Sequence, residues 1–279
     1  MKTWYITGSN RGLGLELARA VLEAGDRVAA AARKPMQITK QLAGYGGRLL
    51  PVELDVTNQH SVQEAAKQVF AEFGHIDVLV NNAGYGQLGV FEQISEADIA
   101  RQFETNVFGT FGVTRSVLPV MRAQRSGIIL TISSIGGLIG FDGSSIYCST
   151  KFALEGWSES LNLELEVFGI KAVLVEPGFF RTDFLDSSSV AYSDIEIPDY
   201  HHYSQARKKQ LDSMNHLQPG DPVKFGQALL KLVNSKSLPV RFAAGSDAFK
   251  VVVGRNQSHQ AEADQWHDLT VSTDIDSKK

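Results

Sequence analysis

Short apolar runs alternate with amphipathic stretches along most of the 279 residues of the chain. Residues 3–7 form an apolar run, residues 15–22 repeat apolar side chains at helical spacing, and residues 27–32 form a second apolar run. A strand, a helix and another strand in this order are typical of a βαβ unit. We therefore expect the N-terminus to open a parallel sheet.

The same alternation continues through the rest of the chain. Further strands are expected at residues 48–57, 76–80, 128–134, 172–178 and 239–244. Helices are expected at about 96–118, from Tyr147 onward, and from Pro222, where Asp221 is the expected N-cap. The fold class predicted is α/β, a single doubly wound, Rossmann-type parallel sheet of about seven strands with helices on both faces.

No repeat or linker divides the chain, so we expect one domain over residues 1–279. An excursion at about 179–219 mixes Ser, Tyr and His without a clean period, and such a segment is usually a functional lid or mobile. The tail after Gly245 carries Trp266 in a polar, partly helical setting. Its end, about 270–279, is expected to be partly disordered.

Composition and charge exclude several classes of function. The net charge is −4 and the basic residues are scattered, so no electrostatic footprint for nucleic acid is present. The single cysteine, Cys148, excludes an intrachain disulfide and fits a reducing compartment. The N-terminus lacks the features of a signal peptide, and no apolar run is long enough to span a bilayer. We expect a soluble, cytoplasmic protein.

Three glycines follow the first strand at once. Gly8, Gly12 and Gly14 stand between that strand and the first helix. Glycines there allow a tight turn, and the helix N-terminus offers N–H groups to a pyrophosphate. Glycines alone are weak evidence, because turns use them for conformational reasons. The flanking strand and helix are the context that a dinucleotide site requires.

Tyr147 and Lys151 are one helical turn apart, so both lie on one face of the expected helix. A nearby ammonium favours the ionised form of a phenol and lowers its pKa. Such a tyrosine can pass a proton to or from a substrate oxygen. Taken alone, the pair is better interpreted as a solvated helix pair, and only the motifs upstream favour the catalytic interpretation.

The order of these motifs resembles that of the classical short-chain dehydrogenase/reductases. The matching motifs are the glycine turn at 8–14, Asp55-Val56, Asn81-Asn82-Ala83-Gly84, Asn106, Ser134, Tyr147 with Lys151, and Pro177-Gly178. They follow the family's order over roughly the first two-thirds of the chain. The chain is most similar to the 17β-hydroxysteroid-dehydrogenase-like and retinol-dehydrogenase-like branch, which implies a lipophilic carbonyl substrate.

The resemblance implies a catalytic set. Tyr147 is the general acid/base and Ser134 hydrogen-bonds the reacting oxygen. Lys151 lowers the pKa of Tyr147 and holds the nicotinamide ribose, and Asn106 anchors a water that links Lys151 to solvent. Ser133 is the rival serine, but neighbours on a strand point to opposite faces and the family spacing selects Ser134.

The resemblance also implies which residues contact the cofactor. They are Gly8, Ser9, Asn10, Arg11, Gly12, Leu13, Gly14, Arg33, Asp55, Val56, Asn82, Ala83, Gly84, Tyr147, Lys151, Pro177, Gly178 and Thr182. Asn81 and Asn82 could instead be simple turn residues. Thr182 could merely cap a local turn, although the family places it at the nicotinamide carboxamide.

Charge at the end of the second strand indicates which cofactor binds. An NAD site has an acidic residue there, whereas this chain has Ala32 followed by Arg33 and Lys34. Arg11 in the glycine turn faces the same region. Guanidinium groups bind phosphate through charge-assisted hydrogen bonds. We therefore expect NADP(H), with Arg11 and Arg33 as its clamp.

Apolar residues flank the expected active-site crevice. They are Tyr85, Phe141, Phe179, Phe184 and Leu185. A mostly apolar wall suits a hydrophobic alcohol or ketone, although Phe179 could as well be ordinary core. His201 and His202 have no acid or cysteine at ligand spacing, so no metal is expected. Cys148 is expected to be a small packing residue.

The function predicted is that of an NADP(H)-dependent oxidoreductase that interconverts an alcohol and a ketone or aldehyde. The alternative is a catalytically weak NADP(H)-binding sensor or scaffold of the same fold. The intact Ser134, Tyr147 and Lys151 favour the enzyme. The resemblance further implies a dimer or tetramer that pairs the helices of Asn106 and Tyr147, a packing that the tail could alter.

Overall fold

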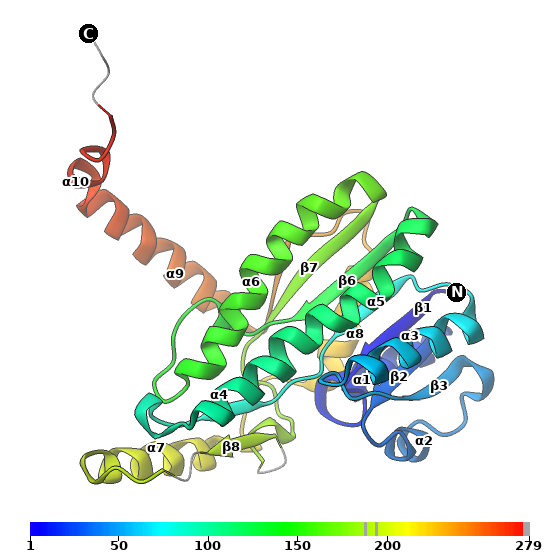
Figure 1. The fold of residues 1–279 in the computed structure, drawn as a ribbon, viewed down its shortest axis with the longest axis horizontal. Coiled ribbons are helices and arrows are strands. Elements are labelled where there is room, and N and C mark those ends of the chain that lie inside the picture. The colour runs from blue at the N-terminus through cyan, green and yellow to red at the C-terminus, as the bar shows by residue number, and fades with distance from the viewer. Residues whose placement is uncertain (187–188, 193–194, 276–279) are drawn as a thin grey trace.

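The computed structural model describes residues 1–186, 189–192 and 195–275. Its centre is a seven-stranded sheet in which every neighbouring pair is parallel, in the order β3-β2-β1-β4-β6-β7-β9 (Figure 1). The strands are β1 (Thr3–Thr7), β2 (Arg27–Ala32), β3 (Leu49–Glu53), β4 (Val78–Asn81), β6 (Gly127–Ile132), β7 (Ile170–Pro177) and β9 (Arg241–Ala244). The doubly wound parallel sheet predicted from the sequence is confirmed.

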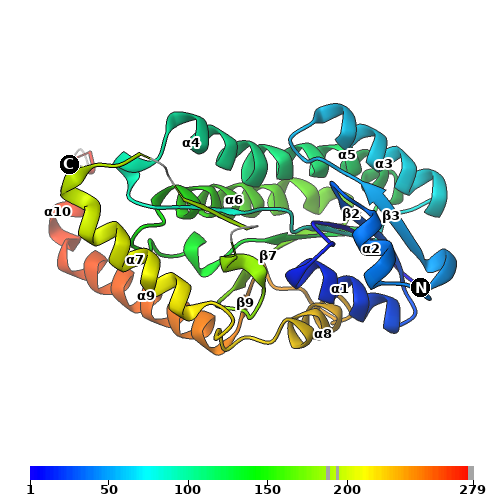
Figure 2. The same cartoon turned by 90° about the horizontal axis from the view of Figure 1, so that it is seen from below.

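Helices cover both faces of the sheet (Figure 2). On one face lie α1 (Gly12–Glu23) and α8 (Pro222–Val233), which pack against each other. On the other lie α3 (Gln59–Phe73), α5 (Gly109–Gln124) and α6 (Ser145–Leu165). The short α2 (Met36–Gln41) follows β2.

The first strand shows how one apolar run serves two cores. Trp4 and Ile6 belong to the core under α1 and α8, whereas Tyr5 belongs to the core under α3, α5 and α6. Successive strand side chains point to opposite faces, so a strand covered on both sides must be apolar throughout. This is why residues 3–7 are a continuous apolar run.

Two strands end earlier than the sequence suggested. β3 ends at Glu53, because the Asp55 carboxylate accepts bonds from both the N–H and the hydroxyl of Thr57 and turns the chain. β6 ends at Ile132, so Ser133 and Ser134 follow the strand. The expected helix start at Asp221 is present, with its carboxylate accepting from the N–H of Val223 at 2.9 Å.

Asn106 lies at a change of helical pitch. α4 (Glu96–Phe103) continues through a π-helical turn at Glu104–Phe108 into α5. Such single π-turns interrupt the regular backbone bonding of a helix and are frequent at functional sites. The continuous amphipathic helix predicted at 96–118 is therefore interrupted at Asn106.

The excursion expected to be irregular contains regular structure. β5 (Gly86–Leu88) pairs in parallel with β8 (Val190–Tyr192), and α7 (His201–Met214) follows. Leu211 is the buried residue of α7, so this helix has no apolar stripe that a periodicity argument could detect. Residues 187–188 and 193–194 of the excursion lie outside the described residues.

The C-terminal helices α9 (Ser246–Gln265) and α10 (His267–Val271) extend away from the sheet (Figure 1). Helix α10 reaches Val271, so the first two residues of the tail expected to be disordered are helical. Residues 276–279 lie outside the described residues. Within the described part of the chain, no helix is both long and apolar enough to cross a membrane.

The contact between α1 and α8 depends on Gly226. A Cβ at this position would lie 2.7 Å from the carbonyl oxygen of Glu16 and 3.1 Å from Cα of Leu17. Alanine normally stabilises a helix relative to glycine, but here it would force the two helices apart. We expect Gly226→Ala to lower the free energy of unfolding by about 1–3 kcal/mol, measured by urea denaturation.

Gly254→Ala in α9 is the matched control. A Cβ at Gly254 meets nothing within 4 Å. This variant should be neutral or stabilising by up to about 1 kcal/mol. Equal effects of the two substitutions would contradict the close helix contact.

Candidate functional site

The turn between β1 and α1 is built by glycines for two separate reasons. Gly8 and Gly12 have positive φ angles of 67° and 56°, which favour glycine. Gly14 is required by space, because a Cβ there would lie 2.5 Å from the carbonyl oxygen of Gly8. Arg11, the N-cap residue of α1, makes no side-chain cap, so it leaves the first N–H groups of the helix to an anion.

Thr7 and Asn82 tie this turn to the end of β4. The Thr7 hydroxyl accepts from the N–H groups of Asn82 and Ala83 at 2.9 and 3.0 Å. The Asn82 amide donates to the carbonyls of Thr7 and Gly8 at 2.9 and 3.1 Å. Asn81 points elsewhere, and its amide donates to Thr114 on α5 at 2.8 Å. Both asparagines therefore hold the scaffold of the site.

A cavity of about 760 Å³ runs along the carboxyl ends of the strands. Its walls include most of the expected cofactor contacts: Gly8, Asn10, Arg11, Gly12, Leu13, Arg33, Asp55, Val56, Asn82, Ala83, Gly84, Tyr147, Lys151, Pro177, Gly178 and Thr182. Ser134 lies on the same wall. The tertiary structure thus gathers residues from six separate loops around one space.

Three expected site residues do not line this cavity. Ser9 is fully buried, and its hydroxyl donates to the carbonyl of Ile6 at 2.6 Å. Gly14 packs against Gly8, as described above. Asn106 is buried as well, so each of these residues supports the wall from behind.

The amide of Asn106 holds the segment that follows β4. Its Nδ2 donates to the carbonyl of Tyr85 at 3.0 Å and to the hydroxyl of Thr150 at 3.2 Å, and its Oδ1 accepts from the N–H of Tyr85 at 3.1 Å. Asn106 therefore links the π-turn to α6 one residue before Lys151. The water that Asn106 is expected to anchor between Lys151 and solvent stays a prediction.

Ser134, Tyr147 and Lys151 converge on the cavity wall. Ser134 is close enough to the phenol of Tyr147 to hydrogen-bond it, which works to lower the phenol pKa. The Ser134 hydroxyl also accepts from the N–H of Gly136 at 3.0 Å. Lys151 Nζ donates to the carbonyl of Ile132 at 2.8 Å and lies 5.6 Å from the ring centroid of Tyr147.

Burial decides the charge states of this set. Removal from water raises the pKa of Tyr147 to about 12, and the hydrogen bond from Ser134 offsets this only in part. Burial also lowers the pKa of Lys151 to about 8. The expected net lowering of the Tyr147 pKa is therefore wrong for this structure, because desolvation of the phenol is the largest cause of the shift and raises the pKa. At neutral pH the phenol is protonated and can donate.

The two adjacent serines diverge as expected for neighbours leaving a strand. Ser133 is directed to Glu155, where its hydroxyl works to lower the carboxyl pKa. Ser134 is directed to Tyr147. Of the two serines, Ser134 is therefore the one that acts on the phenol of Tyr147.

Arginines lie at the end of the cavity near β2. Arg11 and Arg33 both line it beside Ala32, whereas Lys34 is exposed and is not part of the wall. Asn10 reaches α2 by donating to Gln37 at 3.0 Å. No carboxylate stands at the end of β2 itself, where Ala32 is the last residue.

The opposite end of the cavity is mainly apolar. All five expected residues line it: Tyr85, Phe141, Phe179, Phe184 and Leu185. Phe184 packs against Tyr147 with ring centroids 5.7 Å apart. Phe179, for which a core role was an equal alternative, lies on the wall and is partly exposed. Thr182 caps the local turn by accepting from the N–H of Phe184 at 3.3 Å, and it also lies on the wall.

Sequence reasoning missed the part of the wall that comes from β5, β8 and α7. These elements add Leu88, Val190, Arg207, Gln210, Leu211 and Met214. Only the apolar members carry a signal, and it is weak. Their place at the site could be found only from the folded chain.

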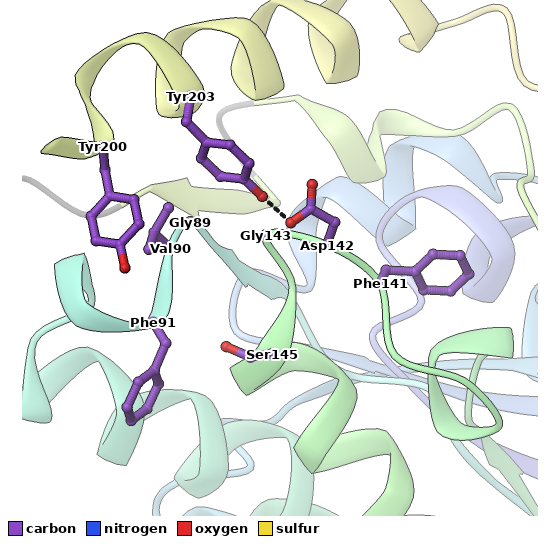
Figure 3. Close-up of a pocket in the computed structure, with 9 residues that line it drawn as sticks. All are labelled: Gly89, Val90, Phe91, Phe141, Asp142, Gly143, Ser145, Tyr200 and Tyr203. Carbon is purple, nitrogen blue, oxygen red and sulfur yellow. Dashed lines mark hydrogen bonds between the residues drawn. The ribbon is translucent and has the colours of Figure 1, made fainter.

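A smaller cavity of about 300 Å³ shows how α7 is attached (Figure 3). Tyr203 donates a hydrogen bond to the carboxylate of Asp142, on the loop between Ser134 and Tyr147. Arg207 donates to the Asp142 carbonyl at 3.1 Å, and Ser204 donates to Gln93 at 2.6 Å. Polar bonds therefore hold α7 across the substrate end of the site.

The described residues contain no set of metal ligands. No group of three or more His, Cys, Asp or Glu side chains in that part of the chain could hold a metal ion. His201 and His202 are exposed residues of α7 that contact each other edge to face.

Known proteins resemble this chain in sequence. The family model described as short chain dehydrogenase matches residues 2–192. The chain is 39% identical over 273 residues to the oxidoreductase BOA17 of Botryotinia fuckeliana, covering 98% of this chain and 99% of that protein. It is 38% identical over 240 residues to the 3-ketodihydrosphingosine reductase of Bacteroides thetaiotaomicron, covering 86% of each.

Solved structures share the fold. A short-chain dehydrogenase from Streptomyces avermitilis superposes with a TM-score of 0.89 at 38% identity, over 98% of this chain and 100% of that one. ElxO with NADP bound gives a TM-score of 0.73 at 26% identity, over 89% and 99%. A short chain dehydrogenase/reductase from Burkholderia phymatum in complex with NAD gives 0.80 at 21% identity, over 100% and 98%, and shows the fold alone.

The hydroxyl of Thr7 generates a stability prediction. Thr7→Val keeps the shape but leaves the N–H groups of Asn82 and Ala83 without their acceptor in a buried turn. We expect a loss of roughly 1–3 kcal/mol in the free energy of unfolding, measured by urea denaturation. Thr39→Val, which removes an exposed hydroxyl bonded to Pro35, is the control and should change little. A comparable loss in both variants would exclude the specific role of Thr7.

Proposed function

The chain belongs to the short-chain dehydrogenase family and is an oxidoreductase of that family, and we propose that it interconverts a lipophilic ketone or aldehyde and its alcohol with NADP(H). One observation carries this proposal. Ser134, Tyr147 and Lys151 lie on one wall of a cavity that also passes the glycine turn and the two arginines. Proton donor and dinucleotide-binding elements thus share a single space.

The proton is proposed to come from Tyr147. Its phenol is protonated at neutral pH, because burial raises its pKa to about 12. It can therefore donate to the carbonyl oxygen of a substrate, with the Ser134 hydroxyl as a second donor to the same atom. The ammonium of Lys151 stabilises the phenolate left behind, and the Ile132 carbonyl orients that ammonium.

The residues of the glycine turn and of the cavity wall fit a dinucleotide. The close approach of Gly14 to Gly8 leaves no room for side chains in the turn, and the α1 N-terminus suits a pyrophosphate. Tyr147 and Lys151 would hold the nicotinamide ribose, and Asp55 and Val56 would lie beside the adenine. When bound, the cofactor supplies or accepts the hydride, so the protein contributes orientation and the proton.

The preference for NADP(H) rests on charge. Arg11 and Arg33 line the cavity at the end of β2, where an NAD site would place a carboxylate. Two guanidinium groups favour a 2′-phosphate. The similar ElxO was solved with NADP bound, which is consistent with this choice.

The apolar end of the cavity supports a lipophilic substrate. Phe141, Phe184 and Leu211 come from three different elements to form this wall. The name of the Bacteroides relative denotes the reduction of a long-chain ketone, which has the same character. The resemblance to hydroxysteroid and retinol dehydrogenases, part of the same proposal, points in the same direction.

Assembly is proposed to be homo-oligomeric through α5 and α6. Phe108, Phe152 and Leu163 are exposed at the π-turn and along α6, with 53%, 42% and 69% of their surface accessible. Burial of such side chains against a second copy would remove apolar surface from water. The elongated α9 leaves this part of the surface uncovered in Figure 1.

Turnover of a panel of carbonyl compounds with NADPH tests the proposed reaction. We expect reduction of lipophilic ketones or aldehydes, and we expect Tyr147→Phe to lower kcat by about 10²- to 10⁴-fold because the proton donor is lost. The affinity of the variant for NADPH, measured by fluorescence titration, should stay within about twofold. Identical turnover by both proteins would favour a sensor or scaffold, and turnover of polar sugars or acyl thioesters alone would refute the substrate class.

The cofactor preference is tested by titration of NADPH and NADH separately. The unaltered protein should bind NADPH more tightly, and Arg33→Asp should shift the preference toward NADH because a carboxylate repels the 2′-phosphate and accepts from a 2′-hydroxyl. Lys34→Asp is the matched control, since Lys34 is not part of the cavity wall. Equal or tighter binding of NADH by the unaltered protein would defeat the assignment.

A further inference from the structure

A second cluster of titratable groups lies behind the catalytic set. Glu155 is one turn of α6 beyond Lys151, and Glu176 stands at the end of β7, directly before Pro177 of the cavity wall. Arg241 of β9 reaches both, with Nε at 3.2 Å from Glu155 Oε2 and 3.5 Å from Glu176 Oε1. Helix α6 and strand β7 thus each supply a carboxyl group, and strand β9 supplies the arginine between them.

Both glutamates are removed from water. Glu155 is 5% exposed and Glu176 is 1% exposed. The Oε1 atoms of both are fully buried and make no hydrogen bond with the described residues, and Glu176 Oε1 has the 3.5 Å ion pair with Arg241 as its charged contact. Two buried carboxylates with orphaned oxygens would be unfavourable, because each would lack the donor that a buried anion requires.

The two carboxyl groups meet at one guanidinium nitrogen, because Arg241 Nε contacts both, and each carboxyl group acts on the pKa of the other. A single proton between them supplies the donor that each side lacks. Gly137 leaves space for this arrangement, because a Cβ there would lie 2.7 Å from Ser133 Oγ and 3.1 Å from Glu155 Oε1. Ser133, the serine that does not face Tyr147, belongs to this cluster.

Three cations surround the pair, and a neighbouring carboxylate competes for one of them. Arg241 is shared with the exposed Glu159, which it binds at 2.9 and 3.3 Å through its two terminal nitrogens. Lys151 faces Glu155 from its own helix, and Arg255 of α9 acts on Glu176. The carboxyl pair therefore lies between Lys151 on one side and Arg241 with Arg255 on the other.

We propose that Glu155 and Glu176 share one proton in the folded protein, and that the single negative charge of this pair is a positioning element that keeps Lys151 charged. Lys151 needs such a partner because its ammonium is buried, and burial favours the neutral amine. Glu155 supplies the opposite charge within one helical turn. The role of Lys151 in catalysis rests on the proposed function, whereas the shared proton does not.

Electrostatics agree with this arrangement. Burial and the neighbouring Glu155 raise the pKa of Glu176 to about 7. Burial likewise raises the pKa of Glu155, with Ser133 and Arg241 opposing. Like charges in one buried site disfavour double ionisation, so the pair binds a proton well above the pH at which free carboxyl groups lose theirs.

Infrared spectroscopy detects the shared proton directly. Near pH 6 most carboxyl groups of a protein are ionised, so a buried acid retains its own C=O stretching band. We expect the unaltered protein to show this band at pH 6 and lose it as the pH rises through about 7. Glu176→Gln should remove the band, and Glu159→Gln, which deletes an exposed carboxylate on the same arginine, should retain it.

The pH dependence of the melting temperature is a second test of the shared proton, independent of infrared spectroscopy. The folded pKa of Glu176 lies above its unfolded value, so its contribution to stability is complete below the unfolded pKa and is lost as pH rises through about 7. The melting temperature of the unaltered protein should therefore fall between pH 5 and pH 8 by more than that of Glu176→Gln. Parallel curves would overturn the shared proton.

Trace labelling of lysines with acetic anhydride, read by mass spectrometry, tests the effect on Lys151. Glu155→Gln removes the charge closest to the ammonium, so the labelling of Lys151 near pH 7 should rise about fivefold, which is the increase in neutral amine when its pKa falls by about one unit from about 8. Glu176→Gln leaves one negative charge on Glu155, and labelling should change less than about twofold. Equal labelling in all three proteins would overturn the positioning role.

These outcomes separate the inference from the proposed function. An infrared band that titrates in a protein inactive on every carbonyl compound would support the carboxyl pair and refute the enzymatic proposal. Carbonyl reduction by a protein without the band would do the reverse. Circular dichroism of each variant establishes that it is folded before either result is interpreted.

Discussion

Burial of the sheet on both faces is the constraint on which the rest of this structure depends. Helices cover each side, so the strands are apolar throughout and polar chemistry can emerge only where they end. The carboxyl ends of parallel strands share one edge, which is where the glycine turn, Ser134 and Pro177 line the same cavity. The location of the site is thus a consequence of how the core is packed.

The same burial governs the electrostatics of the site. Removal from water raises the pKa of Tyr147, lowers that of Lys151 and raises that of Glu176. The charge of Glu155 opposes the lowering of the Lys151 pKa and adds to the raising of the Glu176 pKa. In both cases the effect of burial is larger. The charge of Lys151 therefore depends on its neighbours, and we propose the Glu155–Glu176 pair as one of them.

Two sets of hydrogen bonds hold the site in shape. Thr7 and Asn82 lock the glycine turn to β4, and Asn106 locks the segment after β4 to α6 through Thr150. On the substrate side, α7 is held mainly by polar bonds to the loop at Asp142. The end of the cavity at the glycine turn is consequently built from core elements, whereas its apolar end is built partly from an added segment.

The sequence by itself determined the parallel sheet, the glycine turn and the Ser134, Tyr147 and Lys151 set, because alternating apolar runs and motif spacing are local properties of the chain. It could not determine the wall supplied by α7, whose buried residue Leu211 stands in a mostly polar helix. It also suggested a lowered Tyr147 pKa, which is wrong because desolvation depends on every atom packed around the phenol. The pairing of Glu155 with Glu176, distant in the chain and adjacent in space, was decided by the tertiary structure alone, since only folding brings α6 against the end of β7.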